Sequence, residues 1–136
     1  MKMKTIAANP LAFGLLSTLL AIGITPANAQ LVEAKWADGA FVHQATIAPK
    51  KFLEVCSKLK TGDAVAWRFN AATPTDFNIH YHVGKDVVYP ENRKDVAAAE
   101  GMLTIALDQG YCWMWSNRTS NPVDIDVSLK QGKSGQ

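Results

Sequence analysis

Two histidines, a cysteine and a methionine are the residues of this sequence whose types and spacing could do chemistry. His80 and His82 are separated by a single residue, and Met114 follows Cys112 at the same spacing. Neutral imidazole nitrogens bind copper and zinc, whereas thioether and thiolate sulfurs favour soft ions such as Cu(I). These four side chains could form a metal site if the fold brought them to one place.

The histidines belong to a stretch, residues 77–84, that alternates between apolar and polar side chains. Successive side chains of a strand point to opposite faces, so the pattern predicts a β-strand with one face in the core. The polar face would carry both imidazoles, with Cβ atoms about 6–7 Å apart. The apolar face would carry Phe77, Ile79, Tyr81 and Val83.

A second strand is predicted over residues 111–115, with three aromatic side chains on one face and Cys112 and Met114 on the other. If the two strands were neighbours, their non-aromatic faces would bring the imidazoles close to the sulfur atoms. The sequence then indicates a copper site that uses His80, His82 and Met114. Two alternatives stay open: the histidines are solvent-facing polar residues with Met114 as packing, or they make a pH-sensitive contact.

The two cysteines of the chain, Cys56 and Cys112, have a competing interpretation. An even number of cysteines in an exported chain indicates a disulfide, and this one would close a loop of more than 50 residues. Such a bridge stabilises a fold by about 2–4 kcal/mol. The alternative is a pair of separate buried thiols. A bridged Cys112 could not also bind a metal.

Residues 1–29 have the features of a cleaved secretory signal peptide. Lys2 and Lys4 precede an apolar run over residues 11–24, and Ala27 and Ala29 supply the small-residue pattern for cleavage before Gln30. The alternative is an uncleaved anchor, but the run is short for a spanning helix of about 20 residues. We therefore expect a periplasmic or secreted protein with no stable membrane span after cleavage.

The remaining 107 residues, 30–136, are enough for one domain. They carry 12 Lys and Arg against 12 Asp and Glu, so no basic surplus favours nucleic-acid binding. Short alternating segments separated by turn residues predict an all-β fold, an antiparallel β-sandwich of the immunoglobulin or jelly-roll type with seven to eight strands. A lead-in over residues 30–40 would precede the sandwich at 41–129, and 130–136 would be a flexible tail.

Some local details are part of this prediction. Residues 61–63 are expected to form a hairpin-type turn, and residues 91–100 a surface loop. His43 is expected to be a partly buried strand residue. Asn117 begins a glycosylation sequon, which matters only in a eukaryotic secretory pathway.

The order of several residues resembles the GOLD domain, a β-sandwich of cargo receptors and some lipid-transfer proteins. The matching positions are Cys56, Leu59, Gly62, Asp63, Trp67, Phe69, Asp76, Phe77, Ile79, Val87, Tyr89, Pro90, Gly101, Gly110, Tyr111, Cys112, Trp115 and Asn117. The resemblance covers about residues 41–129 and implies a non-catalytic binding sandwich, with a disulfide near Cys56 and Cys112. The chain departs from the cargo receptors in lacking their coiled coil, membrane span and cytosolic tail, and Met114 occupies the position of their second cysteine.

The sequence contains no nucleophile elbow, phosphate-binding glycine loop or zinc-protease motif. We therefore expect an exported non-enzymatic binding module that needs no cofactor and has a protein or a small ligand as partner. The alternative is a periplasmic copper-binding protein of cupredoxin-like form.

Overall fold

The two longest strands organise the fold. The computed structural model describes residues 29–133, and in it β4 (Asp63–Val83) and β5 (Asp86–Thr104) pair antiparallel along most of their length. β4 also pairs through residues 63–71 with β7 (Val123–Lys133), and through residues 76–80 with β6 (Gln109–Ser116). The first half of β4 therefore lies beside β7 and its second half beside β6.

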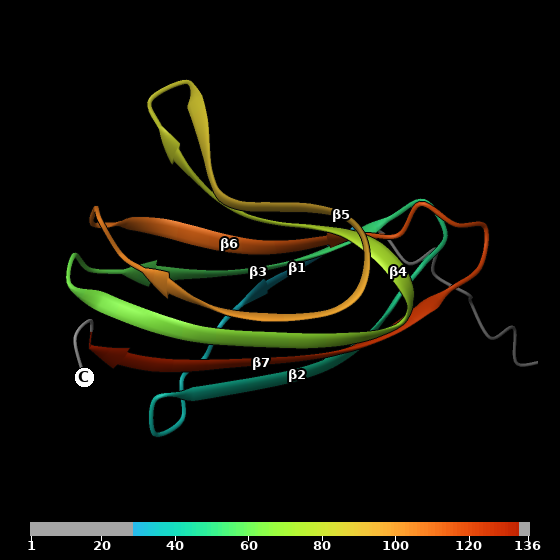
Figure 1. Ribbon diagram of the computed structural model, residues 1–136, viewed down its shortest axis with the longest axis horizontal. Helices are drawn as coiled ribbons and strands as arrows, with labels where there is room; N and C mark the ends of the chain where they lie inside the picture. The colour runs from blue at the N-terminus through green and yellow to red at the C-terminus, as the bar shows by residue number, and fades with distance from the viewer. Residues whose placement is uncertain (1–28, 134–136) are drawn as a thin grey trace, which may run out of the picture.

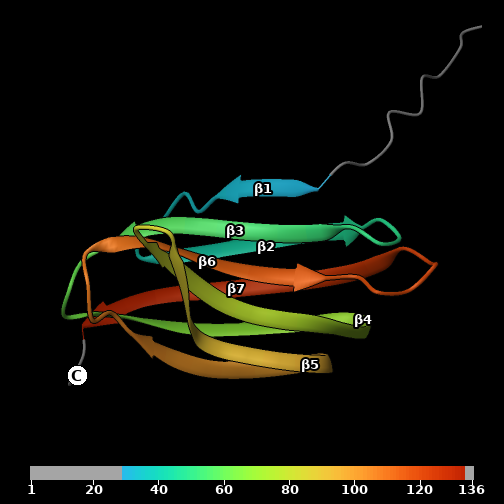
Figure 2. The ribbon, with the colours of Figure 1, turned by 90° about the horizontal axis from the view of Figure 1, so that it is seen from above.

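The remaining strands extend these two neighbourhoods into layers. β6 pairs with β3 (Phe52–Leu59), and β3 pairs in parallel with β1 (Gln30–Glu33). β7 pairs with β2 (Ala40–Ile47). Figure 1 shows β3 and β6 in one layer and β2 and β7 in the other, with β4 and β5 curving from one layer to the other. Figure 2 shows β1 at the margin of the sheet beside β3, and β5 at the opposite margin. The predicted all-β sandwich is confirmed.

Irregular pairing marks the crossing of β4 and β5 between the layers. The register between the two strands shifts between Asn70 and Thr75, and again between Thr75 and Phe77. Pro74 lies in this segment and has no N–H to donate, and Asp95 on the facing strand has a φ of 57°. Bulges of this kind bend a strand and increase its twist, which lets one strand serve both layers.

The core lies between the layers and is centred on aromatic rings. The ring of Phe77 lies 4.9 Å from Trp67, 4.8 Å from Phe69 and 5.4 Å from Trp115, measured between centroids. Trp67 and Phe69 come from the first half of β4, and Phe77 comes from its second half. The alternating residues of this one strand therefore join the two layers from inside. Leu53, Val55, Ile79, Trp113, Ile125 and Val127 are buried around them.

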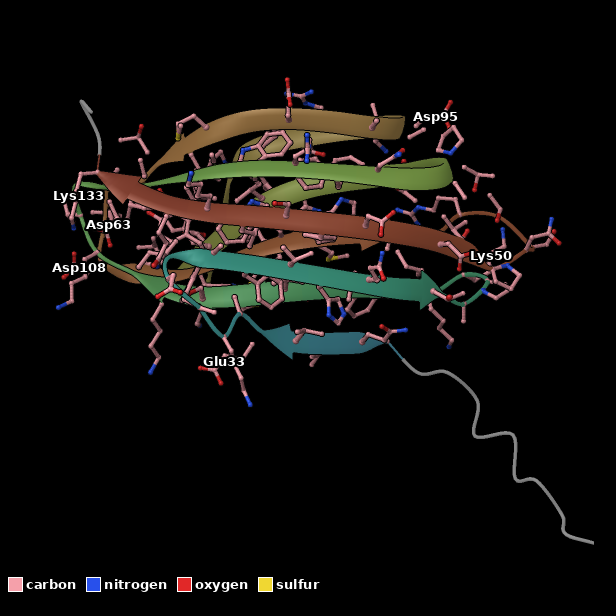
Figure 3. All side chains as sticks on the ribbon, turned by 90° about the horizontal axis from the view of Figure 1, so that it is seen from below. Glu33, Lys50, Asp63, Asp95, Asp108 and Lys133 are labelled. Atoms are coloured by element: carbon pink, nitrogen blue, oxygen red, sulfur yellow. A yellow bond between two sulfur atoms is a disulfide. The ribbon has the colours of Figure 1, made fainter. Side chains whose placement is uncertain are left out.

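The turn after β3 is fixed by polar contacts at one end of the sandwich. Gly62 has a φ of +88°, a conformation that favours glycine. The backbone N–H of Thr61 donates to Asp108 Oδ1 at 2.7 Å, and its hydroxyl donates to the same oxygen at 2.8 Å. These bonds hold the pKa of Asp108 below its usual value. Lys133 forms an ion pair with Asp63 at the same end, where Figure 3 labels both residues with Asp108.

Asn117 fixes the connection that follows β6. Its side chain is 1% exposed, and its Nδ2 donates to the carbonyl oxygens of Ile47, Ala48 and Asn121 at 3.0, 3.2 and 2.7 Å. Its Oδ1 accepts the backbone N–H of Thr119 at 2.9 Å. The sequon asparagine is therefore a buried structural residue.

Several local predictions differ from the structure. The turn at residues 61–63 forms, but β3 and β4 do not pair with each other within the described pairings, because they enter different layers. Residues 91–100 are part of β5, and the lead-in contains β1. β7 extends to Lys133, so the predicted tail begins later than residue 130. Residues 1–28 and 134–136, with the predicted signal peptide up to residue 28, lie outside the described residues.

Candidate functional site

Three strands place the chemically capable side chains on the outer face of the β3–β6–β4 layer. In the register of these strands, Cys56 of β3 lies opposite Cys112 of β6, which in turn lies opposite His80 of β4. The next row along the sheet holds Glu54, Met114 and Asn78. Because the aromatic residues of β6 face the core, these six side chains share the opposite face. The predicted neighbourhood of His80 and Cys112 is confirmed.

Cys56 and Cys112 form a disulfide in the structure. The two residues are direct cross-strand partners, with Cα atoms 4.1 Å apart and a sequence separation of 56. The bridge therefore lies on the outer face beside His80, rather than between the two layers. No free cysteine is present, because both cysteines of the chain are in this bond.

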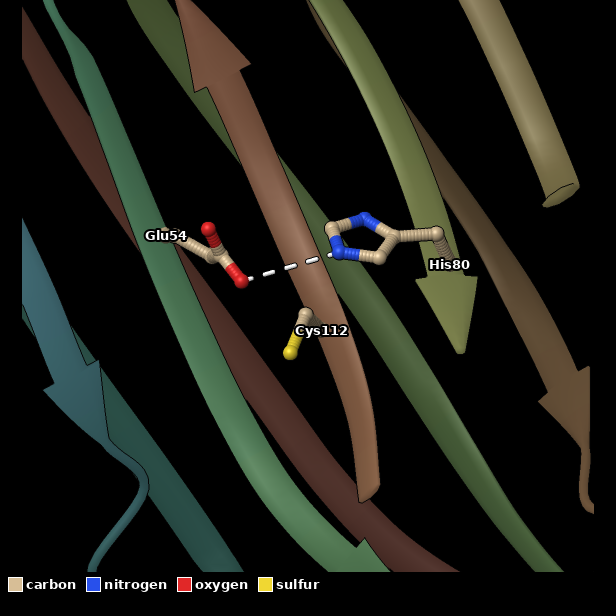
Figure 4. Close-up of side chains that lie close together, drawn as sticks. All are labelled: Glu54, His80 and Cys112. Atoms are coloured by element: carbon tan, nitrogen blue, oxygen red, sulfur yellow. Dashed lines mark ion pairs between the residues drawn. The ribbon is translucent and has the colours of Figure 1, made fainter. Parts of the chain in front are cut away.

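His80 is the buried histidine of this face, at 7% exposure. Its Nδ1 lies 2.8 Å from Asn78 Oδ1, and an amide oxygen only accepts hydrogen bonds, so Nδ1 carries the proton. In the neutral ring, Nε2 then presents a lone pair. That nitrogen lies 3.6 Å from Glu54 Oε1, as the dashed line in Figure 4 shows. The ring of Tyr89 covers the site at a centroid distance of 5.9 Å.

Burial decides the charge of His80. Loss of solvent lowers the pKa of the imidazole below its usual 6.5, the carboxylate of Glu54 opposes this, and His82 adds to the lowering. The neutral imidazole therefore predominates at pH 7. Neutral imidazole is also the form that binds metals.

Glu54 contacts electron-rich atoms on two sides. Its Oε1 lies 3.3 Å from Cys56 Sγ, and this sulfur has no hydrogen to donate because it is in the disulfide. The same oxygen faces the lone pair of His80 Nε2. A proton or a cation between Glu54 and His80 would satisfy both acceptors. Glu54 was missed by the sequence prediction, although strand alternation places it on the same face as Cys56.

The other predicted ligands lie around this group without joining it. His82 is exposed, and its ring centroid lies 5.5 Å from that of His80. Met114 is partly buried one row away, opposite Asn78. The groups within 4.8 Å of one another are Glu54, His80 and Cys112. The expectation that both histidines face solvent is wrong for His80, because Tyr89 and Glu54 cover it. Copper binding through His80, His82 and Met114 stays a prediction.

The other histidine, His43, has a plain structural role. It is partly buried on β2, and its ring stacks on Phe41 at 5.9 Å between centroids. This confirms the expected partly buried strand residue.

The end of the β4–β5 hairpin is the second notable surface. β6 stops pairing with β4 at His80, and beyond this point the two hairpin strands pair with each other. We call residues 81–89 the hairpin arm; Figure 1 shows it rising away from the other strands. A two-residue loop with Gly84 at a φ of 61° closes it. Its exposed apolar side chains are Val83, Val87, Val88 and Tyr89.

A third surface is a shallow depression on the outer face of the other layer. It has a volume of about 660 Å³ and is lined by residues of β2, β4, β5 and β7. Arg68 and Glu100 face each other across neighbouring strands there, with Asp126 and Asn70 in the next row.

The described residues contain no helix that could cross a membrane. No protein-family model matches the sequence, and no curated protein matches it either. The resemblance to the GOLD domain therefore stays a prediction.

Solved structures do share the fold. PliG of Aeromonas hydrophila, a periplasmic lysozyme inhibitor of g-type lysozyme, is similar with a TM-score of 0.59 and 11% identity, over 77% of this chain and 98% of that one. PliG of Salmonella Typhimurium is similar with a TM-score of 0.55 and 13% identity, over 77% and 100% of the two chains. The pre-peptidase C-terminal domain of a Bacillus anthracis collagenase gives 0.54 and 7%, over 78% and 98%. At these identities the likeness establishes the β-sandwich fold alone.

Proposed function

We propose that this protein is an exported, non-enzymatic module that binds a partner protein through the hairpin arm. One observation carries the proposal. Four of the large exposed hydrophobic side chains among the described residues, those of Val83, Val87, Val88 and Tyr89, lie within a single seven-residue stretch. Exposed apolar side chains that are scattered singly need no explanation, whereas a cluster marks an interaction site.

The arm presents this apolar surface on both of its faces. Val87 pairs with His82, and Tyr89 contacts His80, so these side chains lie on the outer face. Val88 pairs with Tyr81, so it lies on the other face. A projecting element that is apolar on two sides buries both only by entering a concave surface. Tyrosine is also enriched among the residues that dominate binding energy at protein interfaces.

Two further observations support the proposal. The PliG proteins, which share the fold, are periplasmic inhibitors of g-type lysozyme, so this type of sandwich can serve as a protein-binding module. The Cys56–Cys112 disulfide fits an oxidising compartment outside the cytoplasm. The GOLD resemblance likewise implies binding rather than catalysis. We infer from these points that the partner is a protein with a cleft, and g-type lysozyme is the first one to test.

The test uses the chain from Gln30 to Gln136, which holds every described strand. Its binding to g-type lysozyme is measured by calorimetry, and its effect on lysis of cell walls by turbidity. We expect binding, and we expect the triple variant Val87→Ser, Val88→Ser, Tyr89→Ser to weaken it by at least about 30-fold, since one central interface side chain is worth about 2 kcal/mol.

The matched control replaces exposed apolar residues elsewhere, with the substitutions Leu31→Ser, Val42→Ser and Met102→Ser. These side chains are 74%, 71% and 65% exposed and lie on β1, β2 and β5, outside the arm. The control should bind as the unmodified chain does. Equal weakening in both triple variants would refute the arm as the contact surface. Absence of any binding would exclude g-type lysozyme as the partner.

A further inference from the structure

The disulfide, Glu54 and His80 bring four potential metal-ligand atoms together, although a disulfide that only stabilises the fold needs neither a carboxylate nor an imidazole beside it. Atoms of Glu54, His80 and Cys112 lie within 4.8 Å of one another, and Cys56 Sγ lies 3.3 Å from Glu54 Oε1. Figure 4 shows Glu54, His80 and Cys112 together on the outer face, and the Cys56 sulfur is bonded to that of Cys112, so two sulfurs, one imidazole nitrogen and one carboxylate oxygen lie close together there. In the oxidised protein the sulfurs are bonded to each other, so only the nitrogen and the oxygen are available.

We propose that reduction of the Cys56–Cys112 bridge converts this cluster into a four-ligand Zn²⁺ site, formed by both thiolates, His80 Nε2 and a Glu54 carboxylate oxygen. The proposal concerns a different activity from the hairpin arm and stands independently of it. It also differs from the copper site that the sequence suggests, which uses Met114 and His82.

The spacing of the ligand atoms fits zinc. Zinc–nitrogen and zinc–oxygen bonds of about 2.0–2.1 Å in a tetrahedron place the two ligand atoms about 3.4 Å apart. His80 Nε2 and Glu54 Oε1 are already 3.6 Å apart. Thiolate ligands of one tetrahedral ion lie about 3.8 Å apart, a separation that cross-strand cysteines reach by side-chain rotation once the bond is cut. Small movements of side chains on fixed strands therefore complete the geometry.

The orientation of the imidazole fits as well. Asn78 Oδ1 accepts the hydrogen of Nδ1 at 2.8 Å, which leaves the lone pair on Nε2, the atom that faces Glu54. A hydrogen bond to the distal ring nitrogen is the usual support of a metal-binding histidine. Glu54 also favours zinc over Cu(I), because carboxylate oxygen is a poor ligand for the softer ion.

The chemistry balances with a dithiol or phosphine as reductant. The reductant gives two electrons, the S–S bond breaks, and two protons produce the thiols of Cys56 and Cys112. A dithiol supplies the two protons itself and becomes a disulfide, whereas a phosphine takes its oxygen atom from water, which also supplies the two protons, and becomes a phosphine oxide. Binding of Zn²⁺ then displaces both thiol protons to solvent, because the thiolate is the ligand. Reoxidation by a small-molecule disulfide transfers two electrons from the two thiolates to that disulfide, which leaves as two thiolates; the Cys56–Cys112 bond re-forms and Zn²⁺ is released, so zinc occupancy follows the redox state of the bridge.

The experiment compares oxidised and reduced protein, residues 30–136. The chain is reduced by a phosphine under nitrogen, separated from the reductant, mixed with Zn²⁺ and desalted. We expect one zinc per reduced chain and none per oxidised chain. Co²⁺ in place of zinc should give the sulfur-to-cobalt absorption of a two-thiolate site. Circular dichroism monitors the fold throughout.

Variants of the two proposed non-sulfur ligands, with an exposed histidine as the control, test which side chains bind the zinc. His80→Gln and Glu54→Gln should each weaken zinc binding to the reduced chain by at least about tenfold, whereas His82→Gln, two residues away and exposed, should leave it unchanged. If reduction alone unfolds the chain, zinc should restore the strand signal.

Three results would overturn the proposal. They are absence of zinc in the reduced chain, unchanged affinity in both the His80 and the Glu54 variants, and failure of zinc to restore a chain that reduction has unfolded. A loss in His82→Gln equal to that in His80→Gln would overturn the ligand set.

Discussion

Gly101 is expected to be among the least replaceable residues of the sheet, because the ring of Trp67 occupies the space where its side chain would be. The two residues are cross-strand partners of β4 and β5. A methyl group at position 101 would lie 2.6 Å from Cζ2 and 2.9 Å from Cε2 of Trp67. The ring cannot move aside freely, since it is 3% exposed and lies 4.9 Å from Phe77 and 5.4 Å from the Arg93 guanidinium.

We therefore expect Gly101→Ala to lower the free energy of unfolding by about 1–3 kcal/mol, the usual cost of overpacking a filled core. For a domain near 100 residues, 2 kcal/mol corresponds to a fall in Tm of about 8 °C or more. Gly110→Ala is the matched control. Gly110 also lies within a strand, and a methyl group there would meet no atom within 4 Å. Its substitution should be neutral or stabilise by about 0.4–1 kcal/mol through the unfolded chain.

Urea unfolding followed by tryptophan fluorescence measures both variants. A double-mutant cycle sharpens the result, because Trp67→Phe removes the ring atoms that clash. Gly101→Ala should cost less in the Trp67→Phe background than in the unmodified chain, by about 1 kcal/mol or more. Equal stability of the two alanine variants, or an additive cycle, would refute the reasoning.

Three further changes test other parts of the structure. Replacing Cys56 and Cys112 together by alanine should cost about 4 kcal/mol, because the bridge closes a loop with a separation of 56 residues. The pKa of His80 is lowered in the folded chain, so the unfolded chain binds the proton more readily. The free energy of unfolding should therefore fall as the pH drops from about 6.5 towards the folded pKa, and this histidine should have no effect on it above pH 6.5. His80→Gln should remove this part of the acid sensitivity. Asn117→Ala should cost about 2–3 kcal/mol, because buried carbonyl groups lose their donor.

Each of these changes has its own control and its own contrary result. Reducing the unmodified chain should reproduce the cysteine variant, and a cost below about 1 kcal/mol would contradict the loop argument. His82→Gln is the exposed control for the acid profile, and an identical profile in both histidine variants would exclude His80 as its source. Asn92 is exposed on β5, so Asn92→Ala should be near neutral; an equal loss there would mean that the Asn117 contacts contribute little.

Strand periodicity determined much of the local structure. Alternation along residues 77–83 and 111–115 correctly assigned the faces of both strands. Side chains alternate between the two faces of a strand, so once the apolar set faces the core the other residues must face outward. The count of two cysteines, in a chain whose sequence predicts export, favoured the disulfide over two separate thiols, and the structure confirms it.

Periodicity did not reveal the length of β4 and β5. Pro74 and the polar residues 91–100 indicate loops when taken locally, yet both lie within strands. Residues 91–100 pair with β4 at most positions, which satisfies their backbone groups, and Pro74 lies in the stretch between Asn70 and Thr75 where the register shifts. A bulge can absorb the proline and the irregular register. Such compensation depends on the partner strand, so no local pattern encodes it.

The character of the candidate site was decided by tertiary structure. The sequence placed His80 and His82 on one outward face, and outward residues are usually solvated. Only strand order puts the disulfide, Glu54 and Tyr89 around His80, leaving His82 exposed two residues away. Residue type and alternation thus determined which side chains face the same way. Which of them touch, and which lose their water, depended on pairing between segments far apart in the chain.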